Sequence, residues 1–411
     1  MKISYDQRDK LYSSKTINIV TFKDDELYIK TKKHKRFNFK VFLIACVSSF
    51  LISTLIFKLI NLYSTEFILD KSTPINFPCD LNIMQYDVLF INNEITDKEK
   101  KNLCNFIKFI NDFNKSYISN EEKLRRFEYY LKNIDEIEKA DKEDDYVEFK
   151  PNKYSDWSDE ELKKLLLTKE EIDYIKDIPE TEDAFLPMEA SNSHLNSNTS
   201  FDWRDRKVIT PVKDQGNCGS CAFFANVAVI ESLYAISGKP LTRLSEQELL
   251  DCDLKENGCN GANRVNIFEF AQRHGVVWEN YYQYKGIQSE CKNMSNRPRV
   301  YISGYKFLGR NEDSWIKYLE TTGPFSVGVQ VPKQMYYYSS GIFDPSEDDC
   351  KNKSMGSHAM AVIGYGEENG KKYWLLKNSW GQGYGFENGY LKMRRGINSC
   401  GIALYAYGAK I

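Results

Sequence analysis

Hydrophobic and polar positions divide the chain into segments of different character, and the first is an apolar run near the N-terminus. Residues 41–57, VFLIACVSSFLISTLIF, carry no charge and follow a basic cluster at residues 32–40. This pattern predicts a membrane-spanning helix over residues 41–62, with residues 1–40 as a cytoplasmic leader. A cleaved signal peptide is the alternative, although a charged leader of this length is long for one. We therefore expect a single-pass type II membrane precursor in the secretory pathway.

Residues 98–141 place Leu, Ile and Phe at helical spacing among Lys and Glu, which predicts two helices. An extended piece, VEFKPNKYSDWSDEEL, follows. From about residue 180 to residue 200 the chain is rich in Glu, Asp, Ser and Asn, and this composition predicts an exposed linker that proteases can cut. We assign residues 63–195 to this helical segment and its linker.

The pattern changes again in residues 196–411. AFFANVAVIESLYAIS is apolar on nearly every face and predicts a buried central helix that Gly238 ends. FSVGVQV, HAMAVIGYG, KYWLLKNSW and GYLKMRR predict strands. A helical half followed by a strand half predicts an α+β fold of two lobes with a cleft between them.

Composition and charge narrow the functions that the chain can have. The sequence shows no cluster of Lys and Arg with interleaved aromatic residues and no glycine-rich phosphate loop, so we expect no nucleic acid as partner. The net charge is −13 over residues 64–195 (18 basic, 31 acidic) and +4 over residues 196–411 (26 basic, 22 acidic). Opposite signs suit an acidic segment that docks on a basic one and leaves as its carboxylates protonate, although ordinary solvated surface charge explains the same values.

Seven of the ten cysteines lie between residues 218 and 400. An odd number permits three disulfides and one free thiol, as expected in an oxidising compartment. Cys218 and Cys221 form a CxxC pair, which also occurs in zinc and redox sites, but no second CxxC or HxxxH accompanies it. We therefore expect no metal and no cofactor.

Four residues form a candidate catalytic group. Cys221 precedes the apolar helix, where the helix dipole favours a thiolate. His358 opens an apolar strand, and Asn378 can fix the tautomer of its ring. Gln215 can join the Cys221 N–H as an oxyanion hole. Each feature alone has an ordinary structural explanation, but together they predict a thiol nucleophile.

The segment DQGNCGSCAFF, with SEQELLDC, GCNG, the His358 strand and NSWGQGYG, resembles papain and the cathepsin L-like peptidases from about residue 201 to residue 411. The resemblance implies the two-lobed papain-like fold, with a helical lobe and an antiparallel β-barrel-like lobe, and a Cys/His/Asn endopeptidase that acts on proteins and peptides. It implies disulfides Cys218 to Cys259, Cys252 to Cys291 and Cys350 to Cys400. It also implies substrate-binding roles for Gly219, Gly261, Ala262, Ser357, Trp380 and Tyr405.

The upstream half resembles the inhibitory propeptide of the same family. One pattern comprises Glu122, Arg126, Tyr130, Asn133, Ile137 and Asp141, and a second comprises Asn152, Tyr154 and Asp156. This implies that the segment covers the cleft as an intramolecular inhibitor, and that its tail runs through the cleft backwards. A leader, an anchor and such a propeptide resemble the membrane-anchored enzymes of apicomplexan parasites, which implies an acidic vacuole or lysosome-like compartment and a monomeric mature domain. Four sequons permit glycosylation: Asn114, Asn198, Asn293 and Asn352.

The sequence departs from the family pattern at the active helix and at the substrate strip. Ala222 replaces the usual tryptophan, Phe223 stands where a small residue is usual, and Ala262 replaces a glycine. A catalytically inactive papain-fold binding or scaffold protein is therefore the alternative. An exopeptidase would need an extra loop that blocks one end of the cleft, and the sequence shows no obvious insertion between the motifs. Tyr405 at the floor of the main specificity pocket, S2, predicts a preference for Leu, Val or Phe over long basic side chains.

Overall fold

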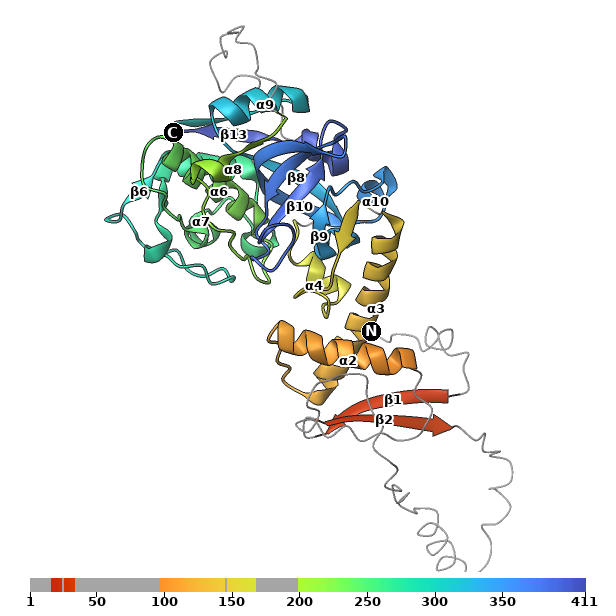
Figure 1. Cartoon of the computed structure of the whole chain (residues 1–411). Helices are drawn as coiled ribbons and strands as arrows, with labels where there is room; N and C mark the ends of the chain where they lie inside the picture. The colour runs from red at the N-terminus through yellow and green to blue at the C-terminus, as the bar shows by residue number, and fades with distance from the viewer. Residues whose placement is uncertain (1–15, 24–25, 34–96, 145, 168–198) are drawn as a thin grey trace, which may run out of the picture. The chain divides into compact units, whose positions relative to one another are not determined.

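The computed structural model describes residues 16–23, 26–33, 97–144, 146–167 and 199–411 (Figure 1). They belong to two compact units, residues 1–128 and residues 129–411. The predicted anchor and most of the predicted linker lie outside the described residues. Within the described ranges, no helix is both long enough and apolar enough to cross a membrane.

The first unit contains a β-hairpin that the sequence analysis did not predict. Strands β1 (Thr16–Lys23) and β2 (Glu26–Lys33) pair antiparallel along their whole length. They fall within the segment that we predicted to be a leader.

Two helices follow, as predicted: α2 (Asp97–Asp112) and α3 (Asn120–Glu143), which continues into the second unit. Leu103, Phe106 and Phe109 are buried at three-residue spacing along α2, and the rings of Phe106 and Phe127 lie 5.0 Å apart. The apolar spacing that predicted the two helices therefore also supplies the contacts between them.

The second unit is built around a seven-stranded sheet with the order β12-β11-β10-β8-β13-β7, in which β4 also pairs with β10. Its strands are β4 (Phe201–Asp202), β7 (Gly304–Phe307), β8 (Phe325–Pro332), β10 (Ser354–Glu368), β11 (Lys371–Lys377), β12 (Tyr390–Arg394) and β13 (Tyr407–Lys410). Two short pairs complete the strands: β3 (Val147–Phe149) with β9 (Tyr338–Gly341), and β5 (Val276–Val277) with β6 (Arg299–Val300). The four predicted strands correspond to β8, β10, β11 and β12.

Three helices of the second unit, α6, α7 and α8, lie together to one side of the sheet, where Figure 1 shows them in green beside the blue strands. The α-helices are α4 (Asp159–Lys163), α6 (Cys221–Ile236), α7 (Glu246–Cys252), α8 (Arg264–His274), α9 (Glu312–Thr321) and α10 (Glu347–Lys351). The 3-10 helices are η4 (Trp203–Arg206), η5 (Gly258–Asn260), η6 (Glu279–Tyr281), η7 (Lys333–Tyr337) and η8 (Ser399–Leu404). Residues 221–233 of α6 are all buried, as its apolar pattern predicts.

Two hydrophobic cores confirm the predicted division into lobes. One comprises mainly strand residues, such as Val327 and Trp374, and the other mainly helix residues, such as Val229 and Phe268. The segment expected to be a propeptide contributes to both, because Leu166 belongs to the first core and Leu167 to the second. The chain therefore passes from one lobe to the other at this point.

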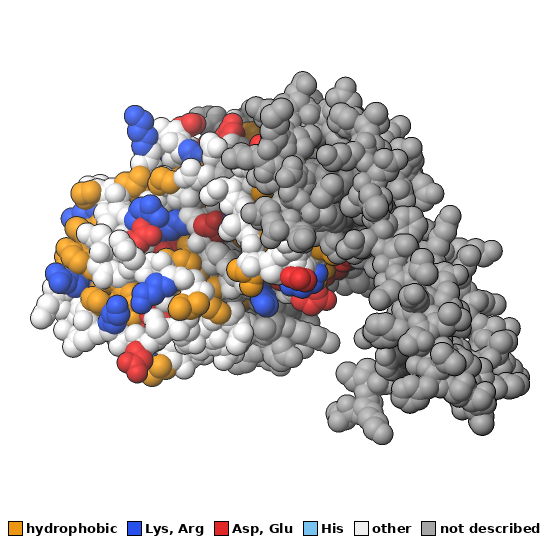
Figure 2. All heavy atoms as spheres, turned by 90° about the horizontal axis from the view of Figure 1, so that it is seen from below, with side chains coloured by type: hydrophobic (Ala, Val, Ile, Leu, Met, Phe, Trp, Pro, Cys, Tyr) orange, Lys and Arg blue, Asp and Glu red, His pale blue; other side chains and the backbone are white. Residues whose placement is uncertain are grey.

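On the face drawn in Figure 2, basic, acidic and apolar side chains alternate over the described residues, with no broad area of a single charge sign.

Candidate active site

Cys221 is the first residue of α6, and its side chain is fully buried. Within the described part of the chain it is the one free cysteine. The backbone N–H of Ala359 lies 3.4 Å from its Sγ atom. A thiol at the start of a sixteen-residue helix faces the positive end of the helix dipole, which stabilises a thiolate once the site opens.

His358 and Asn378 come together from neighbouring parts of the sheet. His358 lies in β10, Asn378 follows β11, and the histidine Nε2 is 2.7 Å from the asparagine Oδ1. The other ring nitrogen, Nδ1, is buried and has no hydrogen-bond partner among the described residues. The residue after His358, Ala359, contacts Cys221 through its backbone N–H, so the histidine in β10 lies one residue away from a contact with the nucleophile.

Trp380 covers this pair. Its ring lies 4.6 Å from the ring of His358 and stacks on Tyr336 at 4.8 Å, with 8° between the planes. The indole is fully buried, so it excludes water from the bond between His358 and Asn378.

Burial keeps the thiol and the imidazole neutral in this structure. It raises the pKa of Cys221 to about 11 and lowers the pKa of His358 to about 4, although the bond from Asn378 acts against the second shift. A neutral thiol is a poor nucleophile, because the thiolate is the reactive form.

Gln215 holds a carbonyl of the propeptide. Its side-chain Nε2 donates to the carbonyl oxygens of Leu165 and Cys218, each at 2.8 Å. The hydroxyl of Ser379 donates to its Oε1 at 2.7 Å and fixes the amide. The donor that we predicted for an oxyanion is therefore occupied by the Leu165 carbonyl.

The segment around Leu166 lies across the site and contacts residues of the peptidase on its way. A side chain at Gly219 would come within 2.5 Å of the Cys259 carbonyl oxygen and within 2.9 Å of the Leu166 carbonyl oxygen, so glycine is needed for both close approaches. The next residue is held as well, because the Leu167 N–H donates to the carbonyl of Ser357 at 2.9 Å. Residues 166 and 167 therefore lie against Gly219 and Ser357, two of the residues expected to bind substrate.

The propeptide is anchored upstream of this crossing. The Asn152 side chain donates to the Tyr336 carbonyl at 2.6 Å and is buried. Lys333 lies 2.6 Å from both Glu136 and Asp159. Burial alone would raise the pKa of Asp159, but its hydrogen bonds from lysines outweigh this effect and hold the pKa below its usual value.

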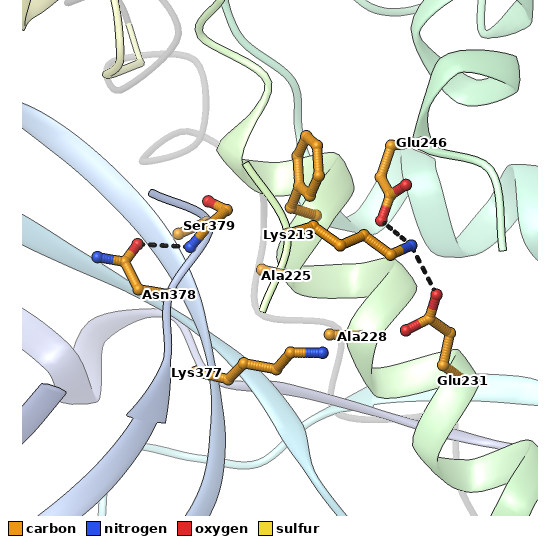
Figure 3. Close-up of a pocket in the computed structure, with 10 residues that line it drawn as sticks. Lys213, Ala225, Ala228, Glu231, Glu246, Lys377, Asn378 and Ser379 are labelled. Carbon is orange, nitrogen blue, oxygen red and sulfur yellow. Dashed lines mark hydrogen bonds and ion pairs between the residues drawn. The ribbon is translucent and has the colours of Figure 1, made fainter. Parts of the chain in front are cut away.

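A buried charge cluster lies beside Asn378, and the sequence analysis did not identify it (Figure 3). The Lys213 ammonium is 2.7 Å from a carboxylate oxygen of Glu231 and 2.7 Å from one of Glu246. Burial raises the pKa of Glu246 to about 7 and lowers that of Lys377 to about 8. Lys377, the residue before Asn378, is linked to the cluster because it donates to Thr210 at 2.7 Å and Thr210 in turn bonds Glu231.

Three disulfides join the pairs that the resemblance implied: Cys218–Cys259, Cys252–Cys291 and Cys350–Cys400. Because Cys218 is oxidised, it cannot serve as a zinc ligand with Cys221. Over the described ranges, no three His, Cys, Asp or Glu side chains are grouped to hold a metal ion.

The unusual residues lie inside the helical lobe. Ala222, Phe223 and Ala262 are all fully buried. Gly261 has φ of +131°, a value that favours glycine. Tyr405 is only half-buried, and its carbonyl accepts a hydrogen bond at 2.6 Å from Arg264, a residue that the sequence analysis did not single out.

Comparisons with known proteins agree with this arrangement. Residues 197–409 match the family described as Papain family cysteine protease, and residues 106–162 match the Cathepsin propeptide inhibitor domain (I29). The chain is 34% identical over 304 residues to a viral cathepsin of Spodoptera exigua nuclear polyhedrosis virus, covering 72% of this chain and 85% of that protein. It is 38% identical over 255 residues to a cathepsin L-like proteinase of Phaedon cochleariae, covering 61% and 75%. Digestive procathepsin L 3 of Tenebrio molitor larval midgut is structurally similar, with a TM-score of 0.64 and 30% identity over 75% of this chain and 99% of that one.

Proposed function

Because the chain belongs to the papain family of cysteine proteases and carries a cathepsin propeptide, we propose that it is the latent precursor of a cysteine endopeptidase with Cys221, His358 and Asn378 as its triad. The observation that carries the proposal is the 2.7 Å contact between His358 Nε2 and Asn378 Oδ1, which leaves Nδ1 unbonded in the described structure. A ring held by one nitrogen with the other free is the arrangement that a thiol nucleophile requires.

The chemistry follows from these positions once the propeptide has left. His358 takes the thiol proton, and the Cys221 thiolate attacks the carbonyl carbon of the substrate. Gln215 Nε2 and the Cys221 N–H donate to the oxyanion. His358 then gives its proton to the leaving amine, and water activated by the same ring hydrolyses the thioester.

The precursor is latent because residues 165–167 lie across the active site. The Leu165 carbonyl takes the Gln215 donor that a substrate carbonyl would use. Burial raises the pKa of Cys221 to about 11 and lowers that of His358 to about 4, which favours the neutral forms of both groups. Removal of this segment hydrates both groups, which favours the ion pair.

The proposal extends to the remaining parts of the chain. We assign residues 1–40 to a cytoplasmic leader, 41–62 to a signal anchor, 63–195 to the propeptide and linker, and 196–411 to the peptidase. The uncharged run and its basic flank support the anchor. Maturation in an acidic vesicle agrees with a histidine that is buried in its neutral form.

A non-catalytic papain-fold binding protein is the second candidate, favoured by Ala222 and Ala262. Neither residue removes a group with a chemical role, and Phe223 fills volume inside the same lobe. The 2.7 Å contact between His358 and Asn378 therefore supports the enzyme.

The test uses the full-length protein in detergent, acidified to release the propeptide and treated with an epoxide inhibitor of thiol peptidases. Mass spectrometry locates the adduct while peptide hydrolysis is followed in parallel. We expect an adduct on Cys221 and loss of hydrolysis. A folded, disulfide-paired protein that neither labels nor cleaves would leave the binding protein as the function.

A further inference from the structure

Arg264 is the first residue of α8, and it is buried with 4% exposure. Its Nη1 donates to the Tyr405 carbonyl at 2.6 Å, and its guanidinium carbon lies 5.4 Å from the centre of the Tyr407 ring. The resemblance assigns Tyr405 to the floor of S2. Arg264 therefore lies beside that floor.

The guanidinium is also close to the nucleophile. A side chain at Gly328 would come within 3.0 Å of Arg264 Nη2, so the missing side chain in β8 makes room for the guanidinium. Gly328 is paired in register with Ala359, whose N–H contacts the Cys221 sulfur. The positive charge also acts on the thiol, because it opposes the burial that raises the pKa of Cys221.

The charge of Arg264 has no counter-ion in the described part of the chain. No carboxylate there forms an ion pair with it, and Tyr405 accepts its one hydrogen bond to a described residue. Burial lowers the pKa of Arg264 to about 10, so the group stays charged at neutral and acid pH. Burying a charged guanidinium without a carboxylate partner raises the free energy of the folded protein. The planar guanidinium can donate two parallel hydrogen bonds to one carboxylate.

We propose that Arg264 makes S2 selective for substrates with a Glu or Asp side chain at the second residue before the scissile bond. This inference rests on the proposed endopeptidase function and names its substrate class. The substrate carboxylate completes a buried ion pair with the guanidinium beside Tyr405. The preference differs from the apolar one that Tyr405 alone predicts, because Tyr405 closes the pocket while Arg264 supplies its charge.

The test compares four peptide substrates that differ only at the second residue before the scissile bond, which is Glu, Gln, Leu or Arg. The full-length protein is matured by acidification and assayed at pH 5.5. We expect kcat/KM for the Glu peptide to exceed that for the Gln peptide by about 30-fold, as for other buried charge pairs. The ratio should fall at lower pH, as the substrate carboxyl protonates near its usual pKa of about 4.3.

Arg264→Leu should abolish the preference for Glu and favour the Leu peptide. Arg273→Leu is the matched control, because Arg273 is exposed on the same helix and pairs with Glu269. If Arg264→Leu does not fold, the ratios and pH dependence of the wild-type enzyme decide the question.

Epoxide labelling of Cys221 separates the two ways in which the test can fail. The acidic selectivity is overturned if the labelled enzyme cleaves the Leu or Gln peptide as well as the Glu peptide and if the kcat/KM ratios are unchanged in Arg264→Leu. Arg264 would then have a structural role only. A folded protein without any labelling or cleavage overturns the endopeptidase function itself.

Discussion

Replacing Asn152 by leucine should loosen the latent precursor. The Asn152 side chain donates to the Tyr336 carbonyl at 2.6 Å, and its Oδ1 accepts from the Tyr154 N–H at 3.0 Å. Leucine has a similar volume but makes neither bond. Because Asn152 is buried, both backbone groups would lose a partner that water cannot easily replace.

The size of the effect follows from the bond that links the propeptide to the peptidase. Leaving the buried Tyr336 carbonyl unpaired costs about 2 kcal/mol, which corresponds to a roughly 30-fold larger open population. Tyr336 also stacks on Trp380, so the bond to Asn152 anchors the propeptide next to the indole that covers His358.

The assay measures how fast a small alkylating reagent modifies Cys221 in the uncleaved protein at neutral pH. The thiol is fully buried, so the rate follows the population of the open form. Asn152→Leu should raise this rate without changing the products. Asn352→Leu is the matched control, because Asn352 is exposed and its side chain bonds Asp348 at 2.8 Å.

An unchanged alkylation rate in Asn152→Leu, with the disulfides formed and the protein folded, would refute the reasoning. The propeptide would then be held by its apolar contacts and ion pairs, and the Tyr336 bond would contribute nothing to latency.

Three further predictions concern the same site. Burial lowers the pKa of His358 to about 4 in the latent form, so the open form, with a pKa near 6.5, binds a proton more readily. The stability of the latent form relative to the open form should therefore fall by up to about 3 kcal/mol as the pH falls from 6.5 to 4. Hydrogen exchange at residues 162–167, corrected for intrinsic rates, should rise across this window, whereas a flat profile would contradict the assignment. Gln215→Ala should lower kcat of the mature enzyme by about 100-fold, and in the precursor it should leave the Leu165 carbonyl without the Gln215 donor. Steady-state kinetics that match the wild type would exclude Gln215 from the oxyanion hole. Lys213→Met removes the ion-pair partner that the buried Glu231 and Glu246 share. Urea unfolding should then show a free energy of unfolding that is lower by about 3–5 kcal/mol. An unchanged free energy of unfolding would show that the cluster does not stabilise the fold.

The elements predicted from the sequence are those whose signal is local. The apolar faces of α6 and the alternation in β8 and β10 depend on neighbouring residues alone. Cys221, His358 and Asn378 could be proposed because each lies at a helix or strand end with a motif around it. The contact between His358 and Asn378 depends on the pairing of β10 with β11. The motifs do not predict this pairing by themselves, and it was expected only from the family resemblance.

What was missed depends on residues far apart in sequence. Arg264 reads as an ordinary helix start, and its burial depends on the absence of a side chain at Gly328, in another lobe. The bond from Gln215 to Leu165 spans 50 residues. The hairpin of residues 16–33 had a local signal, the alternation in TINIVTFK and ELYIKTKK, which the expectation of a leader obscured.

The pairing of β3 with β9 has a consequence for the mature enzyme. Among the described strands, β3 is the sole sheet partner of β9, and Gly341 gives it room, since any side chain there would meet the Tyr146 carbonyl. Release of the propeptide therefore leaves β9 as an open edge with unpaired backbone groups. Four residues are too few to drive self-association, but they retain the hydrogen-bonding pattern for a β3 strand supplied by another molecule.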